Sequence, residues 1–157
     1  MEETAFRVAD FFSFHVELLE SDNTMTESRI RAAEEILENW TSLDHALYII
    51  AFEERRVGFV HIGYRGENVA WIEDIYVDSA FRGRGIASQA IKLAEELIAQ
   101  NKTYTAVCMD VSPRNSDALK LYHRLGYTNL NLITVRKEFG DNKRDKKVNF
   151  LGSEFNY

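Results

Sequence analysis

Two glycines and two arginines occupy a short turn between a predicted strand, which ends at Val77, and a predicted helix. The segment is Arg82-Gly83-Arg84-Gly85-Ile86-Ala87-Ser88. Backbone N–H groups at the start of a helix have no partners inside it, and the helix dipole favours an anion there. Glycine lets the backbone approach that anion closely, and arginine adds charged hydrogen-bond donors. The turn therefore predicts a pyrophosphate site, against the alternative of an ordinary loop with solvated arginines.

The pyrophosphate could belong to a dinucleotide. Gly83, Gly85 and Ser88 fit the G-x-G-x-x-G pattern except at its last position. However, the turn comes late in the chain, several residues separate the strand from the first glycine, and a predicted hairpin precedes it. A Walker-type phosphate loop is excluded because the chain contains no Gly-Lys-Ser/Thr. A dinucleotide-binding enzyme is therefore a distant alternative.

A second motif follows one predicted helix and one predicted strand later. It reads Asn115-Ser116-Asp117-Ala118-Leu119-Lys120-Leu121-Tyr122-His123-Arg124-Leu125-Gly126-Tyr127. Together the two motifs resemble the signatures of the GNAT superfamily of N-acetyltransferases, which are R/Q-x-x-G-x-G/A and N-x-x-A-x-x-L-Y-x-x-L-G-[FY]. The resemblance covers roughly Ala46 to Arg136. The strand at 72–77 is most similar to that of members acting on small molecules, such as aminoglycoside, streptothricin or glucosamine-phosphate acetyltransferases.

The resemblance implies acetyl-CoA as a co-substrate and assigns roles to individual residues. Asn115 would contact the coenzyme or cap its helix. Tyr122 would stand near the thioester sulfur and protonate the leaving thiolate, since an unperturbed tyrosine keeps its proton at neutral pH. The backbone of Ile75, Tyr76 and Val77 would bind the pantetheine arm like an added strand. The pyrophosphate would be held by Arg82, Gly83, Arg84, Gly85, Ile86, Ala87 and Ser88.

A base is also needed, because a protonated amine is not a nucleophile. Some small-molecule relatives carry a carboxylate at the place of Glu73, which makes it the first candidate, with Asp74 the second. Strand alternation predicts that Glu73 shares a face with Ile75, while Asp74 and Tyr76 take the other face. The alternatives are that one carboxylate pairs with an arginine, or that the amine arrives already neutral.

Other reactive side chains are assigned ordinary structural roles. The four histidines are scattered along the chain, and we expect each to be a surface or core residue: His15, His45, His61 and His123. Cys108 lies within a predicted strand and is expected to pack. The basic run from Lys143 to Lys147 is expected to be a solvated loop.

The elements that position these residues follow from the periodicity of apolar side chains. Two amphipathic helices are predicted before residue 41. The rest of the chain gives strands at 47–52, 57–64, 69–77, 105–111, 130–137 and 148–155, and helices at 86–99 and 116–125. We therefore expect one α/β (α+β) domain over residues 1–157, with a mixed, mostly antiparallel sheet of six to seven strands and about four helices. The resemblance puts the coenzyme cleft between the strands at 70–77 and 105–111.

Composition restricts the partners. The 157 residues are 45% hydrophobic and 28% charged, as in a soluble domain. A single cysteine excludes an intramolecular disulfide and argues against zinc, and no metal is expected. The net charge of −6 disfavours nucleic acid, and no apolar run is long enough for a membrane helix. With an acidic N-terminus unlike a signal peptide, these features predict a cytoplasmic protein.

The leading interpretation is an acetyl-CoA-dependent N-acetyltransferase that acts on a primary amine by direct attack. The alternative from another class is a non-catalytic acyl-CoA-binding or sensing module, which would need neither Tyr122 nor a nearby carboxylate. The acceptor is left open among antibiotics, polyamines, amino acids, amino sugars and protein N-termini. The strand-rich C-terminus could pair across a homodimer.

Overall fold

The structure is a computed structural model that describes residues 35–41, 43–137, 139 and 146–156. The chain divides into two compact units, residues 1–110 and residues 111–157. Of the two helices predicted before residue 41, the described part shows helical backbone at 35–40. The remainder of that prediction, including His15, lies outside the described residues, as does most of the basic run near residue 145.

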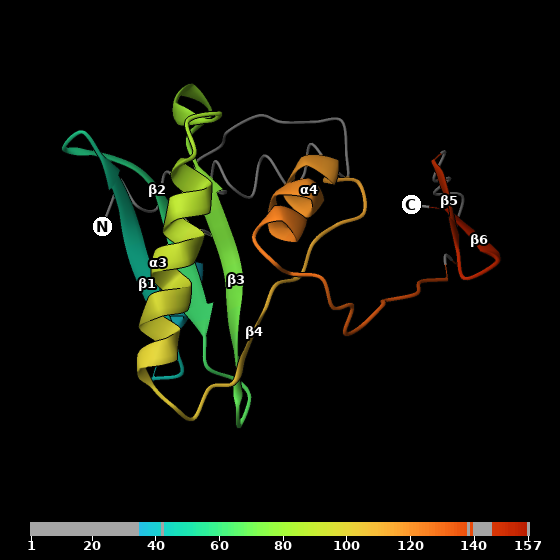
Figure 1. The fold of residues 1–157 in the computed structure, drawn as a ribbon, viewed down its shortest axis with the longest axis horizontal. Coiled ribbons are helices and arrows are strands. Elements are labelled where there is room, and N and C mark those ends of the chain that lie inside the picture. The colour runs from blue at the N-terminus through green and yellow to red at the C-terminus, as the bar shows by residue number, and fades with distance from the viewer. Residues whose placement is uncertain (1–34, 42, 138, 140–145, 157) are drawn as a thin grey trace. The chain divides into compact units, whose positions relative to one another are not determined.

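A four-stranded sheet forms the centre of the first unit (Figure 1). Its strands lie in the order β1-β2-β3-β4, in which the first three are antiparallel and β4 runs parallel to β3. The bounds are β1 His45–Phe52, β2 Arg55–Gly63, β3 Val69–Val77 and β4 Ala106–Cys108. Between β3 and β4 come a 3-10 turn, η1 (Ser79–Phe81), and the helix α3 (Ile86–Gln100).

Helix α3 covers one face of this sheet (Figure 1). Its buried side chains recur at helical spacing: Ile86, Ala90, Ile91, Ala94 and Ile98. Val57 of β2 and Val77 of β3 pack against Ile86. Burial of these aliphatic groups fixes the start of α3 next to the end of β3, so the turn at 82–85 is anchored on both sides.

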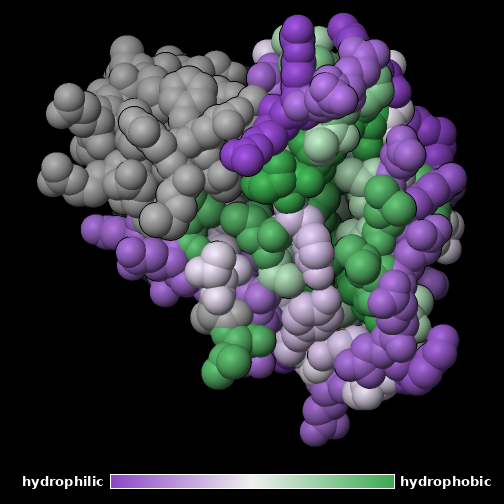
Figure 2. Space-filling model, turned by 90° about the vertical axis from the view of Figure 1, so that its left-hand side faces the viewer, coloured by the Kyte–Doolittle hydropathy of each residue, from purple (hydrophilic) through white to green (hydrophobic). Residues whose placement is uncertain are grey.

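An apolar groove opens between the edge strand β1 and α3 (Figure 2). Its volume is about 280 Å³, and its walls include Tyr48, Phe52, Val60 and Leu93. The groove lies on the face of the sheet that α3 covers.

The second unit contains the helix α4 (Ser116–Arg124) and a hairpin formed by β5 (Lys147–Phe150) and β6 (Ser153–Asn156). Asn115 caps α4, because its Oδ1 accepts a hydrogen bond from the backbone N–H of Ala118 at 3.2 Å. Gly126 follows the helix with φ +101°, a backbone conformation that glycine adopts without strain.

The predicted fold class is confirmed, and the strands at 69–77 and the helices at 86–99 and 116–125 agree within one residue. Several details are wrong. The strand predicted at 105–111 spans only Ala106–Cys108, and the described strands form a four-stranded sheet and a two-stranded sheet instead of one sheet of six to seven strands. Residues 130–137 form no strand, and the single strand predicted at 148–155 is a hairpin that turns at Leu151 and Gly152. Alternating side chains favour an extended chain, but a strand also needs a neighbouring edge to bond, which local sequence does not specify.

None of the helices in the described part of the chain is long and apolar enough to cross a membrane.

Candidate active site

The turn before α3 presents its backbone openly. Gly83 and Gly85 have φ +75° and +79°, the left-handed region that side chains disfavour. A β-carbon on either would meet no other atom within 4 Å. Gly85 is the N-cap of α3 and supplies no side-chain cap, so the first N–H groups of a 15-residue helix remain available to a ligand.

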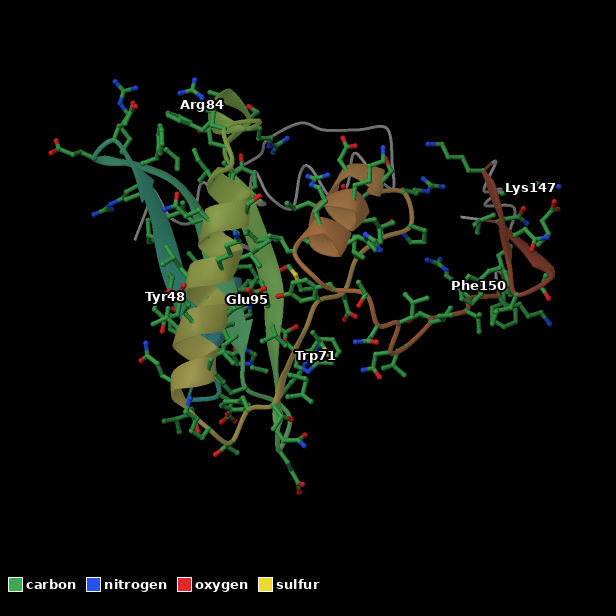
Figure 3. The ribbon with its side chains drawn as sticks, viewed as in Figure 1. Tyr48, Trp71, Arg84, Glu95, Lys147 and Phe150 are labelled. Carbon is green, nitrogen blue, oxygen red and sulfur yellow. The ribbon has the colours of Figure 1, made fainter. Side chains whose placement is uncertain are left out.

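The two arginines of the turn are held by neighbouring groups. Arg82 Nε donates to the carbonyl of Val77 at 2.8 Å, which ties the turn to the end of β3. Arg84 stands at the tip of the turn (Figure 3), with its guanidinium 5.4 Å from the ring of Phe81. Positive charge therefore lies beside an uncapped helix start, an arrangement suited to a phosphate.

The pairing of β3 with β4 covers only the first third of β3. Their parallel pairing joins residues 69–71 to residues 106–108 and ends at Trp71 and Cys108, although β3 continues to Val77. Beyond Trp71 no strand of the described residues pairs with this edge of β3, and an extended ligand could hydrogen-bond to it. This is the stretch that contains Ile75, Tyr76 and Val77.

A β-bulge interrupts β3 at Glu73. His61 pairs with Asp74 and Ile62 pairs with Ile72, so Glu73 has no partner on β2. A β-carbon on Gly63 would collide with Glu73 Oε1, and Gly63 shares the face of His61. The prediction that Glu73 shares a face with Ile75 is therefore wrong. The extra residue turns both carboxylates, Glu73 and Asp74, to the face opposite α3.

Glu73 faces an arginine. Its Oε1 lies 2.9 Å from Arg65 Nε, and Arg65 Nη2 lies 3.7 Å from Asp110 Oδ2. The guanidinium stacks 4.2 Å from the ring of Trp71, which Figure 3 labels on β3. Glu73 Oε1 is buried, and its partner among the described residues is this guanidinium, at an angle that does not align as a hydrogen bond. Glu73 is thus ion-paired with Arg65.

Asp74 faces a histidine. Its Oδ2 lies 2.8 Å from Nδ1 of His61, and Nε2 of His61 lies 2.9 Å from Nδ1 of His45. His61 is buried, with 2% of its surface exposed, and Trp40 stacks on its ring at 4.3 Å. The sequence does not predict this arrangement, since His45 and His61 are each expected there to be an ordinary surface or core residue. The three side chains come from three different strands, and no sequence spacing links them.

Tyr122 lies on α4 in the second unit. Its ring contacts Tyr127, with the ring centroids 6.1 Å apart. Burial raises the pKa of the Tyr122 hydroxyl above its ordinary value of 10.0. The hydroxyl therefore keeps its proton throughout the neutral range, as a proton donor must.

Comparison with known proteins identifies the family. The sequence profile described as "Acetyltransferase (GNAT) family" matches residues 13–127. The chain belongs to the GNAT family of acetyltransferases. The match includes the turn at 82–88, the bulge at Glu73 and the helix that carries Tyr122.

Among curated relatives, the thialysine N-epsilon-acetyltransferases of mouse and cattle are 38% and 36% identical over 72 residues. Those 72 residues are 46% of this chain and 41% of each relative, so the chain spans less than half of the relatives' length in the match.

Solved structures give the same fold. An aminoglycoside N-acetyltransferase in complex with CoA is 27% identical, with a TM-score of 0.55 over 71% of this chain and 87% of that chain. The fold is also shared with a ribosomal-protein-alanine N-acetyltransferase from Brucella melitensis, at 18% identity and a TM-score of 0.63. That match covers 87% of this chain and 94% of the Brucella chain.

Proposed function

We propose that this protein transfers an acetyl group from acetyl-CoA to a primary amine of a small molecule by direct attack. The observation that carries the proposal is the arrangement of β3. This strand runs from a bulge with two carboxylates, Glu73 and Asp74, to an uncapped helix start behind two left-handed glycines. One end of the strand suits a cationic amine, and the other suits a pyrophosphate.

The residues present fit acetyl-CoA, which would supply an acetyl group activated as a thioester. The N–H groups that follow Gly85 would bind the pyrophosphate, since Gly85 gives them no side-chain cap and a β-carbon on it would meet no atom of the described residues beyond its chain neighbours within 4 Å. Ile75, Tyr76 and Val77 would bind the pantetheine arm through the strand edge beyond the end of the β3–β4 pairing. Asn115 already uses its Oδ1 to cap α4, which leaves its amide nitrogen for a contact with the coenzyme.

The chemical step needs one proton acceptor and one proton donor. A carboxylate of the bulge, Glu73 or Asp74, would take a proton from the ammonium, so that the neutral amine can attack the thioester carbonyl. An N–C bond forms and the C–S bond breaks. Tyr122 would then give its proton to the departing thiolate, and the attacking nitrogen, which must lose a second proton to become an amide, would return one to Tyr122 by way of solvent. No covalent bond to the protein is formed.

A small-molecule acceptor is the finer part of this proposal. It is supported by the relatives named thialysine N-epsilon-acetyltransferase and by the aminoglycoside enzyme of similar fold. The family match crosses residue 110, the boundary between the two units, which supports one acetyltransferase domain. We also propose a cytoplasmic location for the enzyme, with acetyl-CoA and the amine as its partners.

Acetyl-CoA should raise the melting temperature. At a hundredfold excess over its dissociation constant, a ligand stabilises the native state by about 2.7 kcal/mol, or roughly 5–10 °C in a protein of this size. NAD at the same concentration should cause no shift, because it lacks the pantetheine arm. Differential scanning fluorimetry with both compounds checks this. Equal stabilisation by NAD would contradict the coenzyme assignment.

Thiol release tests the reaction itself. The protein would be incubated with acetyl-CoA and a panel of amines, comprising lysine analogues, aminoglycosides, polyamines, amino sugars and a peptide N-terminus. We expect CoA release that depends on one of the small molecules. Binding of acetyl-CoA without release for any amine would favour the non-catalytic acyl-CoA-binding module instead.

A further inference from the structure

We infer that Asp74 is the proton acceptor for the acceptor amine, and that His61 and His45 are positioning residues that hold its carboxylate in place. The inference rests on the proposed function and adds two residues that the family motifs do not contain. It starts from the hydrogen-bonded series Asp74–His61–His45, which crosses three strands on the face opposite α3.

The distances fit one arrangement of protons along the series. An ionised carboxylate only accepts hydrogen bonds, so the proton of a neutral His61 ring lies on Nδ1, facing Asp74 Oδ2. The other nitrogen, Nε2, then accepts from Nδ1–H of His45 at 2.9 Å. Both nitrogens of the buried His61 are satisfied, and the ring can point its N–H only at Asp74.

Contacts with two neighbouring rings also restrict the His61 side chain. Trp40 stacks on His61 with the ring planes 20° apart, and the His45 ring lies 5.0 Å away at 30°. A side chain held by two hydrogen bonds and two ring contacts has little rotational freedom left. Asp74 therefore receives a donor at a constant position, and a constant base position is what a proton transfer needs.

Charge distinguishes Asp74 from Glu73. Arg65 faces Glu73 and keeps its positive charge. Protonation of Glu73 would therefore break the ion pair between these two side chains. The partner of Asp74 is an imidazole rather than a guanidinium, and its Nδ1–H can keep donating to Oδ2 while the other oxygen carries the proton. Among the described residues, Asp74 is hydrogen-bonded through Oδ2 only, and 21% of its side chain is exposed.

Among the residues that the structure describes, few charged or titratable groups lie around Asp74. They are His45 from β1, His61 from β2, the neighbouring Glu73, and Arg65, which follows β2. The described helical residues 35–40 contribute the uncharged Trp40. In the transfer, the ammonium loses one proton and Asp74 gains it, and Asp74 returns that proton to solvent after the product has left.

The test is the pH dependence of kcat/KM for the full chain with acetyl-CoA and its best amine. His61→Leu removes the donor, so the carboxylate should hold a proton at higher pH. The acidic limb should move to higher pH, and kcat near pH 7 should fall about tenfold, the worth of one hydrogen bond to a charged group. His61→Asn keeps a donor near the position of Nδ1 and should recover part of both losses.

Two matched variants complete the experiment. In an Asp74→Asn background, His61→Leu should cause no further loss, because the group it positions is gone. Glu73→Gln, the same chemical change one residue away, should leave the acidic limb in place. A wild-type pH profile in both His61 variants would overturn the inference, and so would an acidic limb that moves with Glu73→Gln rather than with Asp74→Asn.

A measurement that needs no turnover tests the inference in variants that are folded but inactive. The Nδ1–H proton of His61 should give a downfield proton NMR signal that disappears in Asp74→Asn and persists in Glu73→Gln. Absence of that signal from the wild-type protein would overturn the inference. Wild-type protein that shows the signal but acetylates no amine would instead overturn the proposed function, and the inference that rests on it.

Discussion

Tyr122→Phe should lower kcat by roughly 10²-fold, the lower end of what general acid catalysis contributes. The substitution keeps the ring and its contact with Tyr127, whose centroid lies 6.1 Å away, and removes only the proton donor. The KM for acetyl-CoA should change little, because the hydroxyl acts on the departing thiolate rather than on the bound coenzyme. Steady-state rates with the best amine measure both parameters.

Tyr127→Phe is the matched control, since it removes a hydroxyl from the adjacent ring of the same unit. It should keep the parent rate. If Tyr122→Phe acetylates the amine as fast as the parent protein, water supplies the proton and Tyr122 has been assigned the wrong role. A protein that only binds acyl-CoA has no rate for either variant to lose.

The pH profile at high pH gives a second check on Tyr122. A general acid works in its protonated form, which predominates below its pKa. Burial raises the pKa of Tyr122 above 10.0, so the acid should be lost only above that pH. We expect kcat to hold up to about pH 10, and the later decline to be missing from Tyr122→Phe. A decline near pH 8 that vanishes in this variant would contradict the direction of the shift.

The parts of the site that the sequence predicted are local ones. The turn at 82–88 depends on residues that are neighbours in the chain, and the structure has the glycines in left-handed backbone at the start of α3. The helix that carries Tyr122 has its capping residue, Asn115, directly before it. Short-range rules of helix capping and backbone sterics are enough to predict such features.

The bulge at Glu73 shows where alternation fails, and the sequence did contain a signal for it. Ile72 and Ile75 are three residues apart, with two acids between them, which breaks the period of two expected for a strand with one buried face. The register confirms that one residue is extra there. Two consecutive acids between the apolar residues Ile72 and Ile75 could therefore have been read as a bulge that turns both to one face.

The histidine series could not have been predicted from one sequence. His45 pairs with Gly63 and His61 pairs with Asp74, so the contacts depend on the register of two strand pairs. A shift of one residue in either pair would send a ring to the opposite face. Register is set by the packing of whole strands, and for that reason each histidine looks unremarkable in its local sequence.

Gly85→Val should weaken acetyl-CoA binding by about two orders of magnitude or more. The N–H groups behind Gly85 begin α3, and a valine at this N-cap position would add bulk next to them in space that the described residues leave open. Losing two hydrogen bonds to a charged phosphate costs about 3 kcal/mol, which corresponds to roughly 100-fold in affinity. Isothermal titration calorimetry with acetyl-CoA measures the change directly.

The same substitution also strains the backbone, and a control must separate the two effects. Gly85 has φ +79°, and a residue other than glycine in that region costs about 1–2 kcal/mol of stability. Gly152, at the turn between β5 and β6, has φ +83° and equally open surroundings. Gly152→Val should therefore lose similar stability and yet bind acetyl-CoA as the parent protein does. If both variants bind equally well, the turn at 82–85 does not approach the pyrophosphate; if both lose binding, strain rather than blocked access explains the loss.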